Sequence, residues 1–164
     1  MGKYKLTKDR LFVYICSLYV CGILFGVFLF RAPGEQNFGE AKFIPVFCAN
    51  YWYVFLMWLF GFSVIGLFFN SLIVFFRGFL FGALLAVLVK TSFKDLAVLT
   101  ALEIIVFIPA FFTLGYFSLA SARKQFYNLF APFTGTLDNK IYLNVMIVVT
   151  VVIVIYSLVI VIYR

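Results

Sequence analysis

Residues 11–30, from Leu11 to Phe30, form an unbroken run of uncharged and mostly apolar residues. An α-helix rises about 1.5 Å per residue, so this run would be about 30 Å long, which is the thickness of a bilayer's hydrocarbon core. In lipid, a helix satisfies all its backbone hydrogen bonds within one segment, whereas an isolated strand does not. The run therefore predicts a transmembrane helix. It is longer than the apolar part of a signal peptide and ends without a small-residue cleavage site, so we expect it to be retained.

The next apolar run, residues 46–89, is too long to cross a bilayer once. Its only charge is Arg77, and as a single helix it would be about 65 Å long. We expect the chain to turn back near Gly66–Ser71, where the Asn70 side chain can cap backbone groups. The whole sequence then gives five predicted spans, at residues 11–30, 46–66, 70–89, 96–120 and 141–163.

The composition supports the same class of fold. Hydrophobic residues make up 66% of the chain and charged residues 12%, whereas about a quarter of the residues are charged in soluble domains. A soluble domain of this length buries only about two thirds of its surface, so it could not hide so much apolar area. We predict an all-α integral membrane protein, a bundle of about five transmembrane helices in which residues 1–164 form a single multi-pass domain.

The basic residues indicate the orientation. Cytoplasmic segments are enriched in Lys and Arg, and four basic residues precede the first span while two follow it. We expect a bacterial cell-membrane protein with a cytoplasmic N-terminus and an external C-terminus. The net charge of +7 favours contact with the anionic headgroups of the lipid bilayer. No basic face is long enough to indicate nucleic-acid binding. The cytoplasmic segments would hold Lys3, Lys5, Lys8, Arg10, Arg123, Lys124 and Lys140, and the external ones Arg31, Lys42, Lys90, Lys94 and Arg164.

The sequence offers little for catalysis. It contains no histidine, which excludes Ser-His and Cys-His mechanisms and most zinc sites. Cys16, Cys21 and Cys48 lack the spacing of a metal site or a disulfide framework. Ser63 lies between two glycines, but the GxSxG spacing of a nucleophile elbow is missing. We predict no catalytic residue, no metal, no cofactor and no enzymatic activity.

Two charges lie inside predicted spans, Arg77 in the third and Glu103 in the fourth. An ionisable side chain within the bilayer costs about 3 kcal/mol on insertion scales, so such residues tend to be paired or functional. Adjacent antiparallel helices would bring the two within reach of an interhelical ion pair. Two other hypotheses stay open. Arg77 could extend to the interface while Glu103 is protonated or hydrogen-bonded, or the two could belong to a proton or ion pathway.

Small residues form stripes on two predicted helices. Gly22 and Gly26 lie four residues apart, and Gly78, Gly82 and Ala86 repeat that spacing. Such stripes let helix backbones approach closely in lipid. The partner could be another helix of this chain or another protein, including a second copy. The full set of candidate packing positions is Gly22, Gly26, Gly61, Gly66, Gly78, Gly82 and Ala86.

Three segments in order, WLFGFSVIG at 58–66, FFRGFLFG at 75–82 and IPAFF at 108–112, resemble the stage II sporulation protein M family. The resemblance covers most of the chain and implies a multi-pass membrane scaffold that acts when the mother-cell membrane engulfs the forespore. Residues 101–104, Ala-Leu-Glu-Ile, depart from the more polar element expected there. No catalytic residue carries over. The matching residues are Trp58, Gly61, Ser63, Gly66, Arg77, Gly78, Ile108, Pro109 and Ala110.

The leading hypothesis is thus a non-enzymatic scaffold that binds cell-wall-remodelling proteins. The alternative is a small membrane subunit of a transporter or channel. A transport pathway needs several polar groups around a common cavity, and the spans contain few beyond the Arg77–Glu103 pair, namely Ser63, Asn70 and Thr100.

Overall fold

The computed structural model describes residues 2–30, 42–91, 93–130 and 139–163. These residues form helices and no strands, and five helical segments are long and apolar enough to cross a membrane. The prediction of an all-α, five-span membrane protein is therefore confirmed.

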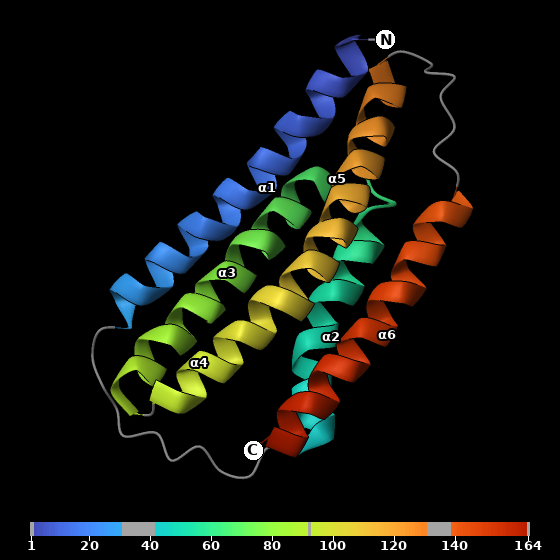
Figure 1. Cartoon of the computed structure of the whole chain (residues 1–164). Helices are drawn as coiled ribbons and strands as arrows, with labels where there is room; N and C mark the ends of the chain where they lie inside the picture. The colour runs from blue at the N-terminus through green and yellow to red at the C-terminus, as the bar shows by residue number, and fades with distance from the viewer. Residues whose placement is uncertain (1, 31–41, 92, 131–138, 164) are drawn as a thin grey trace.

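The helices alternate in direction along the chain (Figure 1). The fourth span is one continuous rod made of two α-helices with a π-helix between them. Successive spans run antiparallel, so the first and third spans run parallel to each other. The elements are α1 (Gly2–Leu29), α2 (Phe43–Phe60), α3 (Gly66–Thr91), α4 (Phe93–Leu102), the π-helix η1 (Glu103–Phe107), α5 (Ile108–Phe130) and α6 (Asn139–Tyr163).

The turn between α2 and α3 lies earlier than predicted. It covers residues 61–65 instead of Gly66–Ser71, and it is wound by short-range bonds such as Ser63 N–H to the Phe60 carbonyl at 3.0 Å. Gly66 begins α3, and the absence of a side chain there leaves room for the Phe60 carbonyl. The prediction that Asn70 caps a helix is wrong, since Asn70 lies buried within α3. The polar cue was misleading because the actual turn is mostly apolar.

The fourth span is longer than the predicted residues 96–120. Residues 121–130 belong to the segment that the prediction left between the fourth and fifth spans, and they continue α5 as regular helix. The remainder of that segment, residues 131–138, lies outside the described residues. The Gln125 side chain donates to the Gly61 carbonyl at 3.4 Å. This bond ties the end of α5 to the α2–α3 turn.

The π-helix η1 ends two residues before Pro109. Its wider turn is closed by the Ile108 N–H, which donates to the Glu103 carbonyl five residues earlier. Proline has no N–H and its ring crowds the carbonyl four residues before it, so it disturbs a regular helix. The Thr113 hydroxyl donates to the Pro109 carbonyl at 2.7 Å. A local π-turn is a known way for a helix to absorb such a disturbance, and π-turns are frequent at functional sites.

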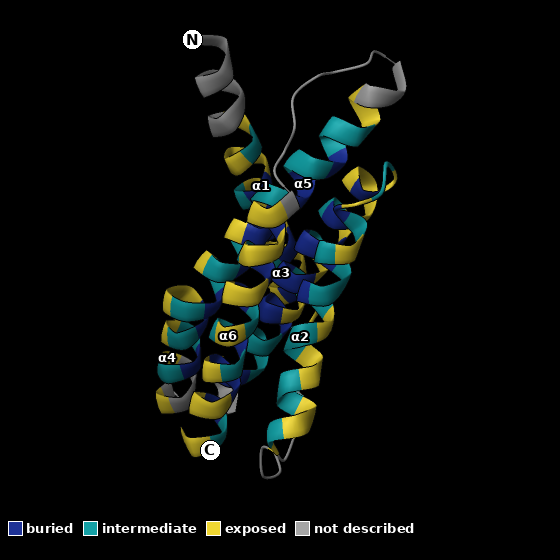
Figure 2. Cartoon of the chain, turned by 90° about the vertical axis from the view of Figure 1, so that its right-hand side faces the viewer, coloured by how far each residue is buried: buried dark blue, intermediate teal, exposed yellow. Residues whose placement is uncertain are grey.

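Buried residues lie on the inner helix faces and exposed residues on the outer faces (Figure 2). Many of the exposed residues are large and hydrophobic. This distribution suits a protein whose surrounding solvent is lipid, because the outer faces need not be polar. Exposed side chains are large and hydrophobic on all five spans, as at Phe28, Trp52, Phe68, Ile105 and Ile162. The fully buried core includes Ile15, Val54, Met57, Val74, Leu114, Leu119 and Ile153.

Candidate functional site

The structure brings the two predicted intramembrane charges into direct contact. Arg77 Nη2 lies 2.6 Å from Glu103 Oε1, and both residues are buried, at 8% and 2% exposure. Arg77 comes from the middle of α3 and Glu103 is the first residue of η1. The antiparallel course of these two spans aligns the positions (Figure 1). A guanidinium and a carboxylate at this distance form a charge-assisted hydrogen bond, which is among the stronger polar contacts in proteins.

Three further polar side chains complete this cluster, which we call the polar core. The Tyr156 hydroxyl donates to Glu103 Oε2 at 2.5 Å, and the Tyr19 hydroxyl makes a long contact of 3.5 Å with Oε1. Arg77 Nη2 also donates to Asn50 Oδ1 at 3.1 Å. Tyr19 is on α1, Asn50 on α2 and Tyr156 on α6. All five spans therefore contribute one side chain to the polar core.

Aromatic rings close the polar core on one side. The Arg77 guanidinium carbon lies 4.1 Å from the centre of the Phe107 ring, a geometry in which the ring face attracts the cation. The Phe107 ring packs in turn against Phe111 and Tyr156, with centroid separations of 5.5 and 5.3 Å. The spacing of Phe107 and Glu103 across η1 lets one turn of the fourth span supply both the anion and the ring. The Glu103 carboxylate and the Phe107 ring together hold the Arg77 guanidinium in one position.

The chemistry open to this site is limited. The Glu103 carboxylate accepts from Arg77 and both tyrosines, and no histidine or cysteine takes part in the cluster. Among the described residues no group of His, Cys, Asp and Glu side chains could hold a metal ion. The polar core joins helices through bonds between its own members. Some buried polar atoms nevertheless lack a protein partner in the described part of the chain, among them Arg77 Nε, Thr100 Oγ1 and Ser157 Oγ.

A second polar cluster adds side-chain hydrogen bonds at the carbonyl end of α2, where the Gly61 N–H also donates to the Met57 and Trp58 carbonyls. A helix leaves its last four carbonyls without an intrahelical partner. Here the Ser118 hydroxyl donates to the Met57 carbonyl at 2.6 Å, and the Tyr142 hydroxyl donates to the Trp58 carbonyl at 2.7 Å. Asn70 Nδ2 donates to Ser118 Oγ at 2.6 Å. The cluster thus links α2 to α3, α5 and α6 around the α2–α3 turn.

Gly61 lies at the centre of this second cluster. A Cβ atom at Gly61 would collide with the Tyr142 hydroxyl and meet Ser118 Oγ at 2.8 Å. Ser63, the residue that superficially resembles a nucleophile, lies in the turn, and its carbonyl accepts from Gly66 N–H at 3.0 Å. The structure therefore places Gly61 in the α2–α3 turn and Gly66 at the start of α3, apart from the two glycine stripes.

The other four predicted glycines lie against one another across α1 and α3. A Cβ at Gly22 or Gly26 would strike the Phe75 or Phe79 carbonyl of α3. In return, a Cβ at Gly78 or Gly82 would strike the Tyr19 or Ile23 carbonyl of α1. The two stripes therefore form one parallel backbone contact within the chain, the kind of packing that glycines four residues apart permit in lipid. Ala86, the last member of the α3 stripe, is partly buried.

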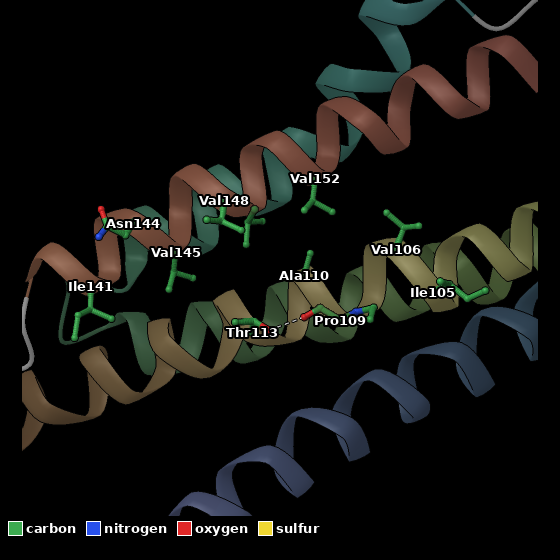
Figure 3. A pocket seen from close by; sticks show the side chains of 11 residues that line it. Ile105, Val106, Pro109, Ala110, Thr113, Ile141, Asn144, Val145, Val148 and Val152 are labelled. Carbon is green, nitrogen blue, oxygen red and sulfur yellow. Dashed lines mark hydrogen bonds between the residues drawn. The ribbon is translucent and has the colours of Figure 1, made fainter.

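Two apolar clefts on the outer surface are formed by residues that the structure describes. The cleft in Figure 3, about 570 Å³, lies between η1–α5 and α6 and includes Pro109, Ala110, Val145 and Val152 in its lining. Its walls are almost entirely hydrophobic side chains, with Thr113 and Asn144 as the polar exceptions. The other cleft, about 520 Å³, lies between α1 and the first half of α3, with Phe126 of α5 at its edge.

Comparison with known families identifies one to which the chain is similar. The family model described as Stage II sporulation protein M matches residues 15–162, which includes every member of the polar core and all four contact glycines. No curated protein and no solved structure matches the chain.

Proposed function

Because the chain belongs to the stage II sporulation protein M family, we propose that it is a non-enzymatic membrane scaffold. Its role would be to assemble peptidoglycan-remodelling enzymes while the mother-cell membrane engulfs the forespore. The family match over residues 15–162 is the observation that carries this proposal. It extends the resemblance seen in the sequence from separate segments to nearly the whole chain.

The polar core supports a structural role. One side chain from each span meets there, and the members bond to each other. Such an internal hydrogen-bond network fixes the arrangement of the five helices. If one helix moved, its polar-core side chain would lose its partner inside a bilayer, where no water can replace that partner. A rigid bundle of this kind suits a protein that positions others.

The proposed orientation is a cytoplasmic N-terminus and an external C-terminus in the bacterial cell membrane. It rests on the excess of Lys and Arg before the first span. The segments after α1 and after α3 would then face the cell wall, on the same side as enzymes that cleave it. The partners would be such enzymes or the membrane proteins that carry them, and a homo-oligomer is compatible with the exposed apolar faces.

The test uses a strain in which the gene is deleted and then restored as wild type. Chemical cross-linking of engulfing cells, followed by purification of the tagged full chain, is expected to recover a peptidoglycan-cleaving enzyme. The septal wall should stay thick in the deletion strain and thin normally after restoration. Normal wall thinning and engulfment in the deletion strain would overturn the proposal, even if an enzyme were recovered.

One observation favours the alternative, a small subunit of a transporter or channel. The polar atoms Arg77 Nε, Thr100 Oγ1 and Ser157 Oγ are buried without a partner among the described residues, and such groups can line a path for water or ions. Proteoliposomes containing the purified chain would decide the matter. Proton or ion flux above that of empty vesicles, lost in Arg77→Met, would replace the scaffold by this alternative.

A further inference from the structure

The cleft between α1 and α3 widens toward one end of the bundle. At Gly22 and Gly78 the two backbones touch. Further toward the beginning of α3, the whole Tyr14 side chain spans the gap, with its hydroxyl donating to Ser71 Oγ at 3.0 Å. The helices therefore diverge from the glycine contact toward the α2–α3 turn. The open part of this V is the cleft of about 520 Å³.

The dimensions of this groove match one leaflet of a bilayer. The α3 residues that line it run from Leu67 to Phe75, and the turn residues Val64 and Ile65 continue the lining. This length of helix and turn spans about 15 Å, half the thickness of a hydrocarbon core. The lining is hydrophobic apart from Tyr14 and Ser71, which bond to each other. A hydrocarbon chain is the ligand that such a groove fits.

Positive charges flank the open end. Arg10 is exposed and lies one helical turn before Tyr14, so it shares the face of α1 that lines the groove. Arg123 lies one turn before the groove residue Phe126 on α5, with its guanidinium carbon 5.4 Å from the Tyr127 ring. The bond from Gln125 to the α2–α3 turn places this part of α5 at the same end of the bundle. The mouth is thus basic and the interior apolar.

We infer that the groove between α1 and α3 binds one anionic phospholipid, with an acyl chain between the helices and its phosphate near Arg10 and Arg123. The charge complementarity of the mouth selects the headgroup, and the apolar groove selects the chain. A basic residue near an anionic membrane surface contributes about 1 kcal/mol, a factor of about five in binding. The inference is independent of any partner protein, so it stands or falls apart from the proposed scaffold role.

The test uses the purified full chain in a neutral detergent. Native mass spectrometry is expected to show one bound phosphatidylglycerol at concentrations where phosphatidylcholine of the same chain length does not bind. Arg10→Gln and Arg123→Gln should each weaken retention about fivefold. Lys94→Gln, which removes an exposed charge at the other end of the bundle, should leave it unchanged. Equal retention of the two lipids, or equal loss in Lys94→Gln, would overturn the inference.

A second pair of variants tests the groove itself. Leu72→Trp would fill it, whereas Leu80→Trp adds the same bulk at a similarly exposed site of α3 outside it. Only the first should abolish phosphatidylglycerol binding, and thermal unfolding without lipid shows that both are folded. Soluble glycerol phosphate should not compete. If Leu72→Trp instead abolished a dimer and left lipid retention unchanged, the occupant would be a second copy and the inference would be wrong.

Discussion

Removing one partner of the Arg77–Glu103 pair should destabilise the bundle far more than removing both. The charges lie 2.6 Å apart and are 8% and 2% exposed, so breaking the pair leaves an unpaired charge away from water. Such a loss costs about 3–5 kcal/mol, whereas replacing a whole buried pair is often nearly neutral. We expect Arg77→Met and Glu103→Gln each to lower the free energy of unfolding by that amount.

The double variant should cost clearly less than either single change. In Glu103→Gln, the new amide oxygen can still accept from the Tyr156 hydroxyl, which in the wild type donates to Glu103 Oε2. In Arg77→Met, the new thioether side chain keeps apolar contact with the Phe107 ring, which the guanidinium now covers. The coupling energy should therefore be at least about 3 kcal/mol, at or above the upper end of the range for residues in direct contact. Unfolding in mixed detergent micelles, followed by circular dichroism, gives the four free energies.

The control is Lys94→Met, which removes an exposed cation and should change stability by less than about 0.5 kcal/mol. Strictly additive losses for Arg77→Met and Glu103→Gln would refute the reasoning. They would mean that each side chain is stabilised by its other neighbours and that the pair itself contributes little.

Three other perturbations have defined outcomes. Gly82→Leu should lower the free energy of unfolding by about 1–3 kcal/mol, because the new side chain would strike the Ile23 carbonyl; unchanged stability would contradict the α1–α3 contact. Ser118→Ala should cost about 1–3 kcal/mol through lost buried hydrogen bonds, measured by the same unfolding assay. In a cysteine-free background, Lys42→Cys should react with an impermeant thiol reagent in whole cells and Lys140→Cys only after lysis; the reverse pattern would invert the topology.

The spans were predictable because lipid imposes a simple rule. Each crossing needs about 20 apolar residues in a helix, and the runs that satisfy it are visible without tertiary information. Boundaries depend on finer chemistry. The α2–α3 turn is built from Gly-Phe-Ser-Val-Ile at 61–65, which has almost no polarity to mark it. The continuation of α5 beyond Ala120 was missed for the opposite reason, since its polar residues indicated a loop.

Only two of the five polar-core residues could be identified from the sequence. A charge within an apolar run is rare and therefore conspicuous, so Arg77 and Glu103 stood out. Tyr19 and Tyr156 did not, because they are two of 10 tyrosines and a tyrosine in a span is ordinarily read as packing or an interfacial anchor. Asn50 falls early in the predicted span 46–66, where polarity is unremarkable, although in the structure it lies near the middle of α2. Only the folded arrangement shows that these three side chains point at the ion pair.

The α1–α3 glycine contact and the polar core stabilise the bundle in different ways. Lipid provides little hydrophobic drive for helices to associate, so the α1–α3 glycine contact supplies close packing. Glycine-mediated packing fixes the distance between α1 and α3 better than it fixes their axial register. One helix could shift along the other by a turn and still make close contact. The polar core removes that freedom, since sliding α3 by one turn would separate Arg77 from Glu103 by about 5 Å. A variant that keeps the glycines but lacks the ion pair should therefore stay helical and inserted in the membrane. Its helices should no longer adopt one unique arrangement.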